Sequence, residues 1–447
     1  TLTRQRAALA MPGPVEADLL IIGGGFTGLW AAVEAKRRNP DRDVVLLEME
    51  RIAFGASGRN GGFIDPSLTH GLSNGLARYP EAEVRTLLQL GDESYDQIMA
   101  TIREFAIDCD FHRNGTVWAA TEPYQLHGLT DAVAHYNAFG LEAEVLHQEE
   151  LRELVHSPFY LGGLRTPNEG GLVDPARLAW GLLRTAIKLG VRVHEQTQVV
   201  RLEDQGTRMV VHTDRGRVAA RRVIHGTSAY PGVIPAIRRY VAPVYDYVLM
   251  TEPLTEEQHR SIGWQTRFGL SDGENQFVYH RMTSDRRILY GGWDAVYQKN
   301  GRVSPAFDTR DASHQFLARR FFRTFPQLEG LRFSHRWGGA IDTCSRFAVF
   351  FDTLHGGKVA YAAGYTGLGV GASRFGATTA LDLVDGIDSE ATRLSLVQKR
   401  PMPFPPEPLR GPTIQSVQWL MHRADQNEGR RSPPLRALDK LGLGFDS

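Results

Sequence analysis

Cysteine is scarce in this chain, whose 447 residues include only Cys109 and Cys344, far apart in the sequence. This number and spacing exclude a disulfide framework and give no metal-ligand pattern, so we expect a reduced, intracellular protein without a metal site. An excess of charge is missing as well, because 51 lysine and arginine residues face 51 aspartate and glutamate residues. Without a basic field, nucleic acid and anionic membranes are not expected partners, and a small-molecule substrate is the default.

Long apolar runs are also missing. No stretch approaches the roughly 20 apolar residues of a membrane span. The segment from Thr1 to Glu16 carries charge and proline but no apolar core of signal-peptide length, so we expect a cytoplasmic protein. With 447 residues, of which 42% are hydrophobic, the chain can form two or three domains of about 150 residues each.

The N-terminal part contains a glycine-rich turn between a predicted strand and a predicted helix. A short buried strand, the turn, an alanine-rich helix, a second apolar strand and an acid follow one another at residues 19–22, 23–28, 29–38, 44–47 and 48. Gly23 permits the tight turn, Gly25 lets the backbone approach a pyrophosphate, and Gly28 lets the helix pack close to the strand. The helix N-terminus would face the phosphates, and Glu48 would accept hydrogen bonds from ribose hydroxyls. The spacing therefore predicts a dinucleotide cofactor.

A second glycine-rich loop follows the acid, with the sequence Gly-Ala-Ser-Gly-Arg-Asn-Gly-Gly at residues 55–62. A nicotinamide dehydrogenase has no need of such a loop, whereas FAD extends its pyrophosphate and ribityl chain past the first turn. Ser57, Arg59 and Asn60 can supply polar groups and one cation along that chain. The loop therefore favours FAD as the cofactor.

These loops and four later segments resemble the D-amino-acid oxidase superfamily of flavoproteins, in the branch with glycine oxidase, sarcosine oxidase and the γ-glutamylputrescine oxidases. The later segments lie at 170–175, 190–200, 223–227 and 362–370, and the resemblance runs from about residue 18 to residue 386. It implies an α/β plus α+β fold, with a Rossmann-type, glutathione-reductase-like FAD domain and an inserted antiparallel-sheet substrate domain. The FAD-binding residues expected from the two loops and from the resemblance are Gly23, Gly25, Phe26, Thr27, Gly28, Glu48, Met49, Ala56, Ser57, Arg59, Asn60, Gly61, Gly62, Val200, Gly226, Thr227, Gly364, Thr366, Gly367, Leu368 and Gly369.

The order of the motifs predicts two interleaved domains. Residues 1–69, 146–230 and 335–388 are expected in the FAD-binding domain, and residues 70–145 and 231–334 in the substrate domain. The first insert opens with an amphipathic helix, whose apolar residues recur at helical spacing from Val84 to Phe105. The second insert is rich in Val, Tyr, Phe and Leu at 241–251, 275–282 and 287–293, which is typical of strands.

Residues 389–447 form a C-terminal, proline-rich extension beyond the resemblance. Four prolines in six positions make 399–406 an extended strap, and one short helix is expected at 415–423. The extension can wrap the chain's own surface or form a dimer contact. A monomer and a homodimer both remain open.

Departures from the resembled family bear on the substrate. Its amino-acid-oxidising members place an arginine after a Trp-x-Gly turn to hold the substrate carboxylate. Here Ile341 stands at that position in the run from Trp337 to Asp342, which disfavours a simple α-amino acid held in that way. The run resembles the γ-glutamylputrescine oxidase branch and points to an amine. Asp342 would attract an ammonium group or, alternatively, serve as a turn residue or flavin-side hydrogen-bond acceptor.

Two further departures concern the flavin. Sarcosine-oxidase-like members attach FAD through a cysteine at a position that corresponds to about Gly339, and Cys344 lies five residues later, so noncovalent FAD is expected. Those members also use a lysine over the flavin to activate oxygen, whereas the matching strand at 289–293 contains none. Oxygen and another electron acceptor therefore both remain open.

The expected reaction is hydride transfer from the α-carbon of a neutral amine or N-substituted amino acid to FAD, giving an imine that water hydrolyses. We select His280 as the catalytic residue, with Tyr245 and Trp293 as walls. Because neighbours along a strand point to opposite faces, a His280 that faces the flavin would turn Tyr279 and Arg281 away. A satisfied surface or core histidine is the alternative. A dehydrogenase, an α-amino-acid oxidase and a binding protein with structural FAD are the other function classes.

Overall fold

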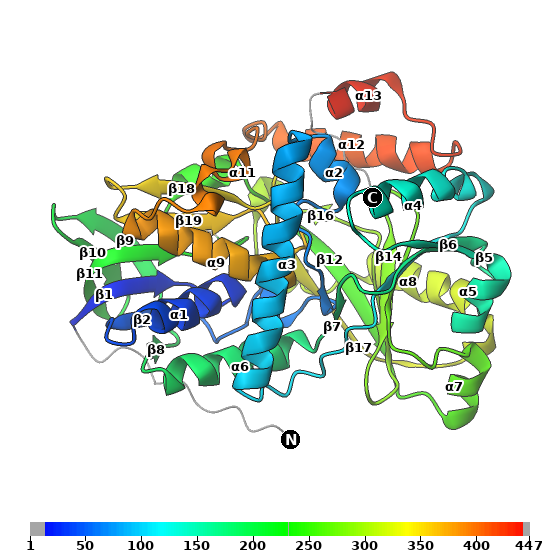
Figure 1. Cartoon of the computed structure of the whole chain (residues 1–447), viewed down its shortest axis with the longest axis horizontal. Helices are drawn as coiled ribbons and strands as arrows, with labels where there is room; N and C mark the ends of the chain where they lie inside the picture. Colours follow the sequence, from blue (N-terminus) through cyan, green and yellow to red (C-terminus); the bar gives the residue numbers. More distant parts are fainter. Residues whose placement is uncertain (1–13, 231, 441–447) are drawn as a thin grey trace.

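The computed structural model describes residues 14–230 and 232–440, and it contains two large sheets that lie side by side (Figure 1). Most of the segment from Thr1 to Glu16, in which no signal peptide is expected, lies outside the described residues. The first sheet has the strand order β18-β19-β11-β1-β2-β8, with the hairpin of β9 and β10 attached to β11. Its strands are β1 (Val15–Ile22), β2 (Val44–Leu47), β8 (Arg192–His194), β9 (Val199–Asp204), β10 (Met209–Thr213), β11 (Gly216–His225), β18 (Phe350–Leu354) and β19 (Val359–Ala363).

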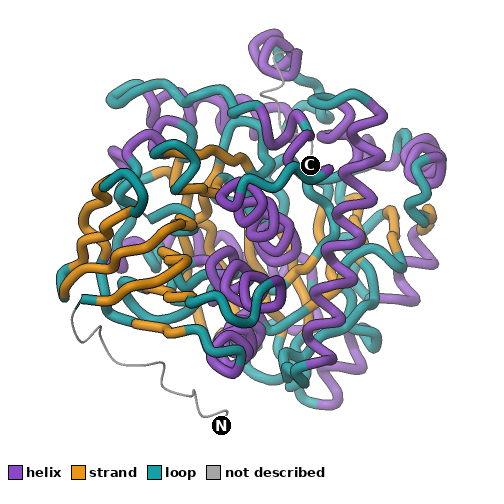
Figure 2. Tube along the Cα trace, turned by 60° about the vertical axis from the view of Figure 1, so that its left-hand side comes forward, coloured by secondary structure: helices purple, strands orange, loops and turns teal. Residues whose placement is uncertain are grey.

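The first sheet is a Rossmann-type α/β layer. Strand β1 pairs in parallel with β2 on one side and with β11 on the other, and every residue of β2 is buried. Helices α1 (Phe26–Arg38), α6 (Pro175–Lys188) and α9 (Gly369–Asp385) share one hydrophobic core with it. Figure 2 shows these helices and the strands as separate layers. The predicted strand, glycine turn, helix and strand are therefore confirmed.

The second sheet has the order β16-β12-β15-β14-β13-β4-β6-β5, and β17 pairs with β12 along its other edge. Most neighbouring strands are antiparallel, and one face packs an aromatic core against α8 (Asp311–Thr324). Its strands are β4 (Thr116–Ala120), β5 (Glu144–His147), β6 (Gly162–Thr166), β12 (Ala242–Thr251), β13 (Gly269–Asp272), β14 (Val278–Met282), β15 (Ile288–Gly292), β16 (Val296–Tyr297) and β17 (Phe333–Thr343). The three strands predicted in the second insert thus exist as β12, β14 and β15.

The boundaries between the two parts differ from the expected ones. Residues 146–166, expected in the FAD-binding domain, supply half of β5 and all of β6 to the second sheet, and β17 joins that sheet as well. The predicted amphipathic helix exists as α3 (Glu81–Glu104), but its buried face packs in the core of α1 and α9. These differences arise from tertiary contacts. The order of the motifs along the chain does not reveal with which sheet or helices each segment packs.

The C-terminal extension begins beside the first sheet, where residues 389–398 lie next to β18, and its later part lies over the second sheet (Figure 1). Its strap carries no regular secondary structure from residue 401 to 406, as predicted, and the following helix α12 (Arg410–Asp425) is longer than the expected 415–423. Helix α13 (Pro433–Lys440) ends the described chain. The remaining short elements are α2 (Leu72–Leu76), α4 (Leu129–Ala138), α5 (Gln148–Leu154), α7 (Glu256–Ile262), α10 (Glu390–Arg393), α11 (Ser395–Gln398) and the β3 (Phe63–Ile64) and β7 (Gly171–Leu172) pair. Among the described helices, none is both long and apolar enough to cross a membrane.

Candidate functional site

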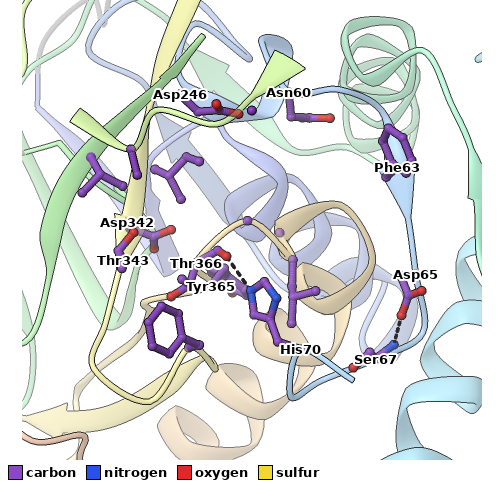
Figure 3. Close-up of a pocket in the computed structure, with 18 of the residues that line it drawn as sticks. Asn60, Phe63, Asp65, Ser67, His70, Asp246, Asp342, Thr343, Tyr365 and Thr366 are labelled. Carbon is purple, nitrogen blue, oxygen red and sulfur yellow. Dashed lines mark hydrogen bonds between the residues drawn. The ribbon is translucent and has the colours of Figure 1, made fainter. Parts of the chain in front are cut away.

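A cavity of about 930 Å³ lies between the two sheets. Its walls come from both glycine-rich loops, the start of α9, strands β12 and β17, and the C-terminal extension. Figure 3 shows part of this cavity, with side chains from the FAD-binding part and from the second sheet turned toward one another. The cavity is therefore a site that both parts of the chain build together.

The N-terminus of α1 opens into the cavity. Gly25, Phe26 and Thr27 line it, and Gly25, as a glycine, offers the helix amides no capping side chain. The Phe26 N–H donates to Ser57 Oγ at 2.9 Å, which joins the first glycine turn to the second loop. A Cβ on Gly28 would lie 1.9 Å from the Gly23 carbonyl oxygen, so glycine is required for the close packing of helix and strand. This cradle fits a pyrophosphate.

The N-terminus of α9 opens into the same cavity. Leu368, which precedes the helix, has an apolar side chain that cannot accept from the helix amides. Thr27 Oγ1 donates to the Tyr365 hydroxyl at 2.9 Å and so ties this turn to α1. The expected FAD-binding residues that line the cavity are Gly25, Phe26, Thr27, Ala56, Ser57, Arg59, Asn60, Gly61, Gly62, Gly226, Thr366, Gly367, Leu368 and Gly369. Two helix N-termini, which favour negative charge, thus meet at one site, and these residues fit FAD.

The other expected FAD-binding residues lie outside the cavity lining: Gly23, Gly28, Glu48, Met49, Val200, Thr227 and Gly364. The Glu48 carboxylate accepts from the N–H groups of Gly24 at 2.7 Å and Glu50 at 2.8 Å. Burial raises the pKa of Glu48, and those two amides oppose the rise. Val200 is 54% exposed, and a contact of its backbone with adenine stays a prediction. A ribose role for Glu48 stays a prediction.

The charged side chains of the cavity are mostly acidic. The carboxylates among its lining residues are Asp65, Asp92, Glu169, Asp246, Asp294 and Asp342. Against them, the described lining contains one arginine, Arg59, and no lysine. Arg59 pairs with Asp308 at 2.5 Å. Burial lowers the pKa of His70 to about 4, so this histidine is neutral at pH 7. The cavity therefore suits a cationic ligand.

Asp246 is the carboxylate nearest to the second glycine loop in Figure 3, where it lies beside Asn60. Its Oδ2 accepts from the Tyr279 hydroxyl at 2.6 Å. Burial raises the pKa of Asp246 to about 6, while Tyr279 and the backbone N–H groups of Tyr247 and Gly292 lower it and Asp294 raises it further. The main groups that act on the pKa of Asp246 thus include no cation, and no described arginine, lysine or histidine forms an ion pair with it. A cation in the cavity would find an uncompensated negative charge here.

Asp342 is bound to the FAD-binding part. Its Oδ2 accepts from the Gly364 N–H at 2.8 Å, and burial raises its pKa to about 6. This hydrogen bond favours the alternative in which Asp342 is a backbone acceptor beside the flavin motif. Ile341 lines the cavity next to it.

The structure corrects the choice of His280 and Tyr245. On β14, Tyr279 lines the cavity, and His280 points to the opposite face, where its Nε2 lies 2.6 Å from the Tyr160 hydroxyl. On β12, Val244, Asp246 and Val248 line the cavity, whereas the hydroxyl of Tyr245 bonds with Ser304 on the other side. Side chains alternate along both strands as expected, but the residues that face the cavity are the neighbours of the predicted ones. Charge was the missed signal, since Asp246 interrupts an otherwise apolar and aromatic strand.

Trp293 and the two arginines Arg281 and Arg374 differ in their position relative to the cavity. Trp293 does line the cavity and stacks on Phe316, with the ring centroids 3.6 Å apart. Arg281 is buried outside the cavity lining and donates to the Gly61 carbonyl, and Arg374 pairs with Glu34 at 3.1 Å. Neither arginine faces the cavity in the described structure, so neither stands in for the one that Ile341 replaces.

Cys344 lies at the cavity wall but is fully engaged there. Its Sγ donates to the carbonyl oxygens of Ala348 at 3.1 Å and Gly364 at 3.3 Å. Burial raises the pKa of its thiol, which keeps it protonated and a poor nucleophile. Cys109 is buried in the core of the first sheet, and burial raises its pKa to about 12.

The fold and the cavity define a flavoprotein oxidoreductase, and the comparisons agree. The model of the FAD dependent oxidoreductase family, DAO, matches residues 18–382, so the chain belongs to this family. Over 399 residues it is 33% identical to gamma-glutamylputrescine oxidoreductase of Escherichia coli (strain K12), covering 88% of each chain. It is 28% identical to the probable oxidoreductase OrdL of Haemophilus influenzae, covering 87% of this chain and 86% of that one.

A solved structure has the same fold. Glycine oxidase from Geobacillus kaustophilus superposes with a TM-score of 0.71 at 20% identity, over 86% of this chain and 99% of that one. The predicted FAD domain with its antiparallel substrate sheet is thereby confirmed. The family match also ends at residue 382, close to the predicted end of the resemblance and before the C-terminal extension.

Proposed function

We propose that the protein oxidises the C–N bond of a primary or secondary amine, with noncovalently bound FAD. FAD supplies the two-electron acceptor when it is bound. The amine loses a hydride from its α-carbon, and water hydrolyses the resulting imine to an aldehyde and ammonia or a smaller amine. The carboxylate of Asp246 in the cavity carries this proposal, because it lines the cavity and forms no ion pair with a described residue, so it can pair with an ammonium group.

The residues around Asp246 have three tasks in this reaction. Asp246 binds the ammonium form and accepts its proton, since a pKa of about 6 leaves the carboxylate ionised at neutral pH. Tyr279 fixes the carboxylate through its 2.6 Å hydrogen bond. Trp293, stacked on Phe316, provides a rigid wall that helps to exclude water.

An α-amino acid is the less supported substrate. A substrate carboxylate needs a cation, and Arg59, the arginine of the described lining, already pairs with Asp308. Ile341, at the position where the resembled amino-acid oxidases have an arginine, lines the cavity. The similarity to gamma-glutamylputrescine oxidoreductase also supports an amine at the end of a longer chain.

One observation favours an acceptor other than oxygen for the electrons of the reduced flavin. The described cavity lining has no lysine, the residue that the resemblance links to oxygen activation. A dehydrogenase that passes electrons to a quinone or a protein carrier is therefore the second candidate. Reoxidation of the reduced enzyme by air and by a quinone, followed side by side, decides between the two.

The proposed function is tested by Asp246→Asn, with Asp294→Asn as the matched control. Asp294 also lines the cavity, but it pairs with Arg310 at 2.5 Å, so its charge is already compensated. We expect Asp246→Asn to lower kcat/KM for amines about 100-fold, the effect of about 3 kcal/mol for a lost buried charge partner, and Asp294→Asn to change it less than about fivefold. Flavin reduction in anaerobic stopped-flow is the measurement.

Paired substrates that differ only in an α-carboxylate complete the test. The amine without the carboxylate should reduce the flavin faster. At saturating substrate, the rate of flavin reduction should rise with pH as the bound amine loses its proton. A carboxylate-bearing partner that is faster by about tenfold or more would instead identify an amino-acid oxidase. Equal activity of Asp246→Asn and the wild type would remove Asp246 from the proposal.

A further inference from the structure

The C-terminal extension, which lies beyond the family match, forms one wall of the cavity. Met402 and Phe404 of the strap and Ile414, Val417 and Met421 of α12 line it. The other lining residues of the extension are Pro403, Pro405, Thr413, Gln418 and Leu438. This wall is mainly apolar and its residues carry no charge, whereas the rest of the cavity supplies all of the carboxylates.

Helix α12 is turned with a defined face toward the cavity. Ile414, Val417 and Met421 are spaced at three and four residues, so they share one side of the helix. Trp419 lies on another side, where it is 55% exposed and stacks with the Arg423 guanidinium, 4.9 Å from the ring centroid. Ile414, Val417 and Met421 thus form the side of α12 that faces the cavity.

Hydrogen bonds hold the strap and the end of α12 in place. At the strap, the Phe404 N–H donates to the Arg239 carbonyl at 2.8 Å, and Ser345 Oγ donates to the Met402 carbonyl at 2.6 Å. At the end of α12, the Asn275 N–H donates to Asp425 Oδ1 at 3.0 Å. Between them, Phe404 and Ile414 pack against the buried Ala242, Val244 and Tyr297. The wall is therefore a fixed part of the site.

We propose that this wall selects the substrate by its carbon chain. The inference rests on the proposed amine oxidation: Asp246 holds the ammonium end, and the apolar residues of the extension contact methylene groups farther along the chain. Each methylene that leaves water against this wall strengthens binding. The preferred substrate is accordingly an amine with an extended aliphatic segment, and short amines react poorly.

The test compares Val417→Gln and Met421→Gln with Trp419→Gln, a change on the exposed side of the same helix. The substrates are n-alkylamines from ethylamine to hexylamine. For the wild type and Trp419→Gln, kcat/KM should rise about three- to fourfold per methylene, which corresponds to about 0.8 kcal/mol per buried methylene. For the two cavity-face variants, the rise should fall below about twofold per methylene. An equal rise in all four proteins overturns the proposal.

A binding measurement separates failure of the wall from failure of the proposed function. Neutral n-alkanols, from ethanol to hexanol, are titrated into the FAD-loaded proteins, and the shift in flavin absorbance gives their affinity. A steep dependence on chain length that flattens in Val417→Gln and Met421→Gln supports the wall, even if no amine reduces the flavin. An affinity that is independent of chain length, or equally steep in all variants, overturns the wall, even if amines are oxidised.

Discussion

At the scale of single residues, Asp246 is the side chain in which function and stability conflict. A carboxylate in a strand that is otherwise apolar and aromatic loses hydration on folding, which is the main reason why its pKa rises to about 6. The Tyr279 hydroxyl and the Tyr247 N–H recover part of that loss. A substrate ammonium group would recover the rest, so the residue is costly to the empty fold and useful to the complex.

The prediction at this scale is that Asp246→Asn stabilises the fold at high pH. A raised carboxyl pKa gives stability that is present below the unfolded value, near 3.8, and lost as the pH rises through about 6. The neutral amide avoids that loss and should raise the free energy of unfolding by about 1–3 kcal/mol at pH 8. The gain should shrink as the pH falls toward 4.

Denaturant unfolding at several pH values measures this effect, with Asp294→Asn as the control. Because Asp294 pairs with Arg310, its replacement should give no stabilisation at pH 8. A destabilised Asp246→Asn at pH 8, or a gain that does not depend on pH, would show that burial does not dominate the pKa of Asp246.

At the scale of elements, two helices begin at the cavity, and their first turns consist of uncharged residues. Gly25 precedes α1 and Leu368 precedes α9, and neither side chain accepts from the first turn of its helix. Because the Phe26 N–H donates to Ser57 Oγ, α1 offers a ligand the amides that follow Phe26. An anion is the ligand that such helix ends favour. The glycines of the first turn differ in what they permit: Gly25 leaves space for a ligand, and Gly28 leaves space for the strand.

We predict that Gly25→Val abolishes FAD binding but leaves the fold intact, whereas Gly28→Ala destabilises the fold itself. A Cβ at Gly25 would lie 3.0 Å from Ser57 Oγ, a side chain that can turn away, but it would occupy the space next to the phosphates. A Cβ at Gly28 would lie 1.9 Å from a backbone oxygen that cannot move without β1. Flavin content and circular dichroism of both variants separate the two effects. A fully yellow Gly25→Val would refute the assignment of the phosphate site.

At the scale of the whole molecule, the cavity exists only where the two sheets and the extension meet. FAD bound there would contact several parts of the chain at once and link them. A ligand that binds only the folded protein raises its stability by mass action, by about 2.7 kcal/mol at a free concentration 100 times its Kd. Bound FAD is therefore expected to raise the free energy of unfolding of the whole protein.

The prediction at this scale is that FAD is released intact on denaturation. Acid precipitation should leave a colourless pellet and FAD in the supernatant, because the Cys344 thiol is held protonated by burial and bonds to two carbonyl oxygens. The apoprotein should regain its melting temperature when FAD is added back. Cys344→Ser is the control and should behave in the same way. Colour that stays in the pellet of the wild type but leaves that of Cys344→Ser would demonstrate a covalent link.

The sequence by itself determined the features that depend on neighbours in the chain. The strand, glycine turn and helix around Gly23, Gly25 and Gly28 follow from backbone geometry that only glycine provides, and they are confirmed as β1 and α1. Strands β12, β14 and β15 follow from local composition. The lining of the cavity by residues 56, 57 and 59–62 follows from the composition of the second glycine-rich loop in the same way.

Only the tertiary structure decided the features that depend on distant partners. Because side chains alternate along a strand, Tyr279 and His280 face opposite sides of the sheet. Which of these two sides faces the cavity depends on α8 and the aromatic core, which cover the side of His280. For the same reason, neither the place of residues 146–166 in the second sheet nor the position of α12 over the cavity could be predicted. Such contacts join segments far apart in the chain, and their free energy comes from burial in the complete fold, which no local pattern encodes.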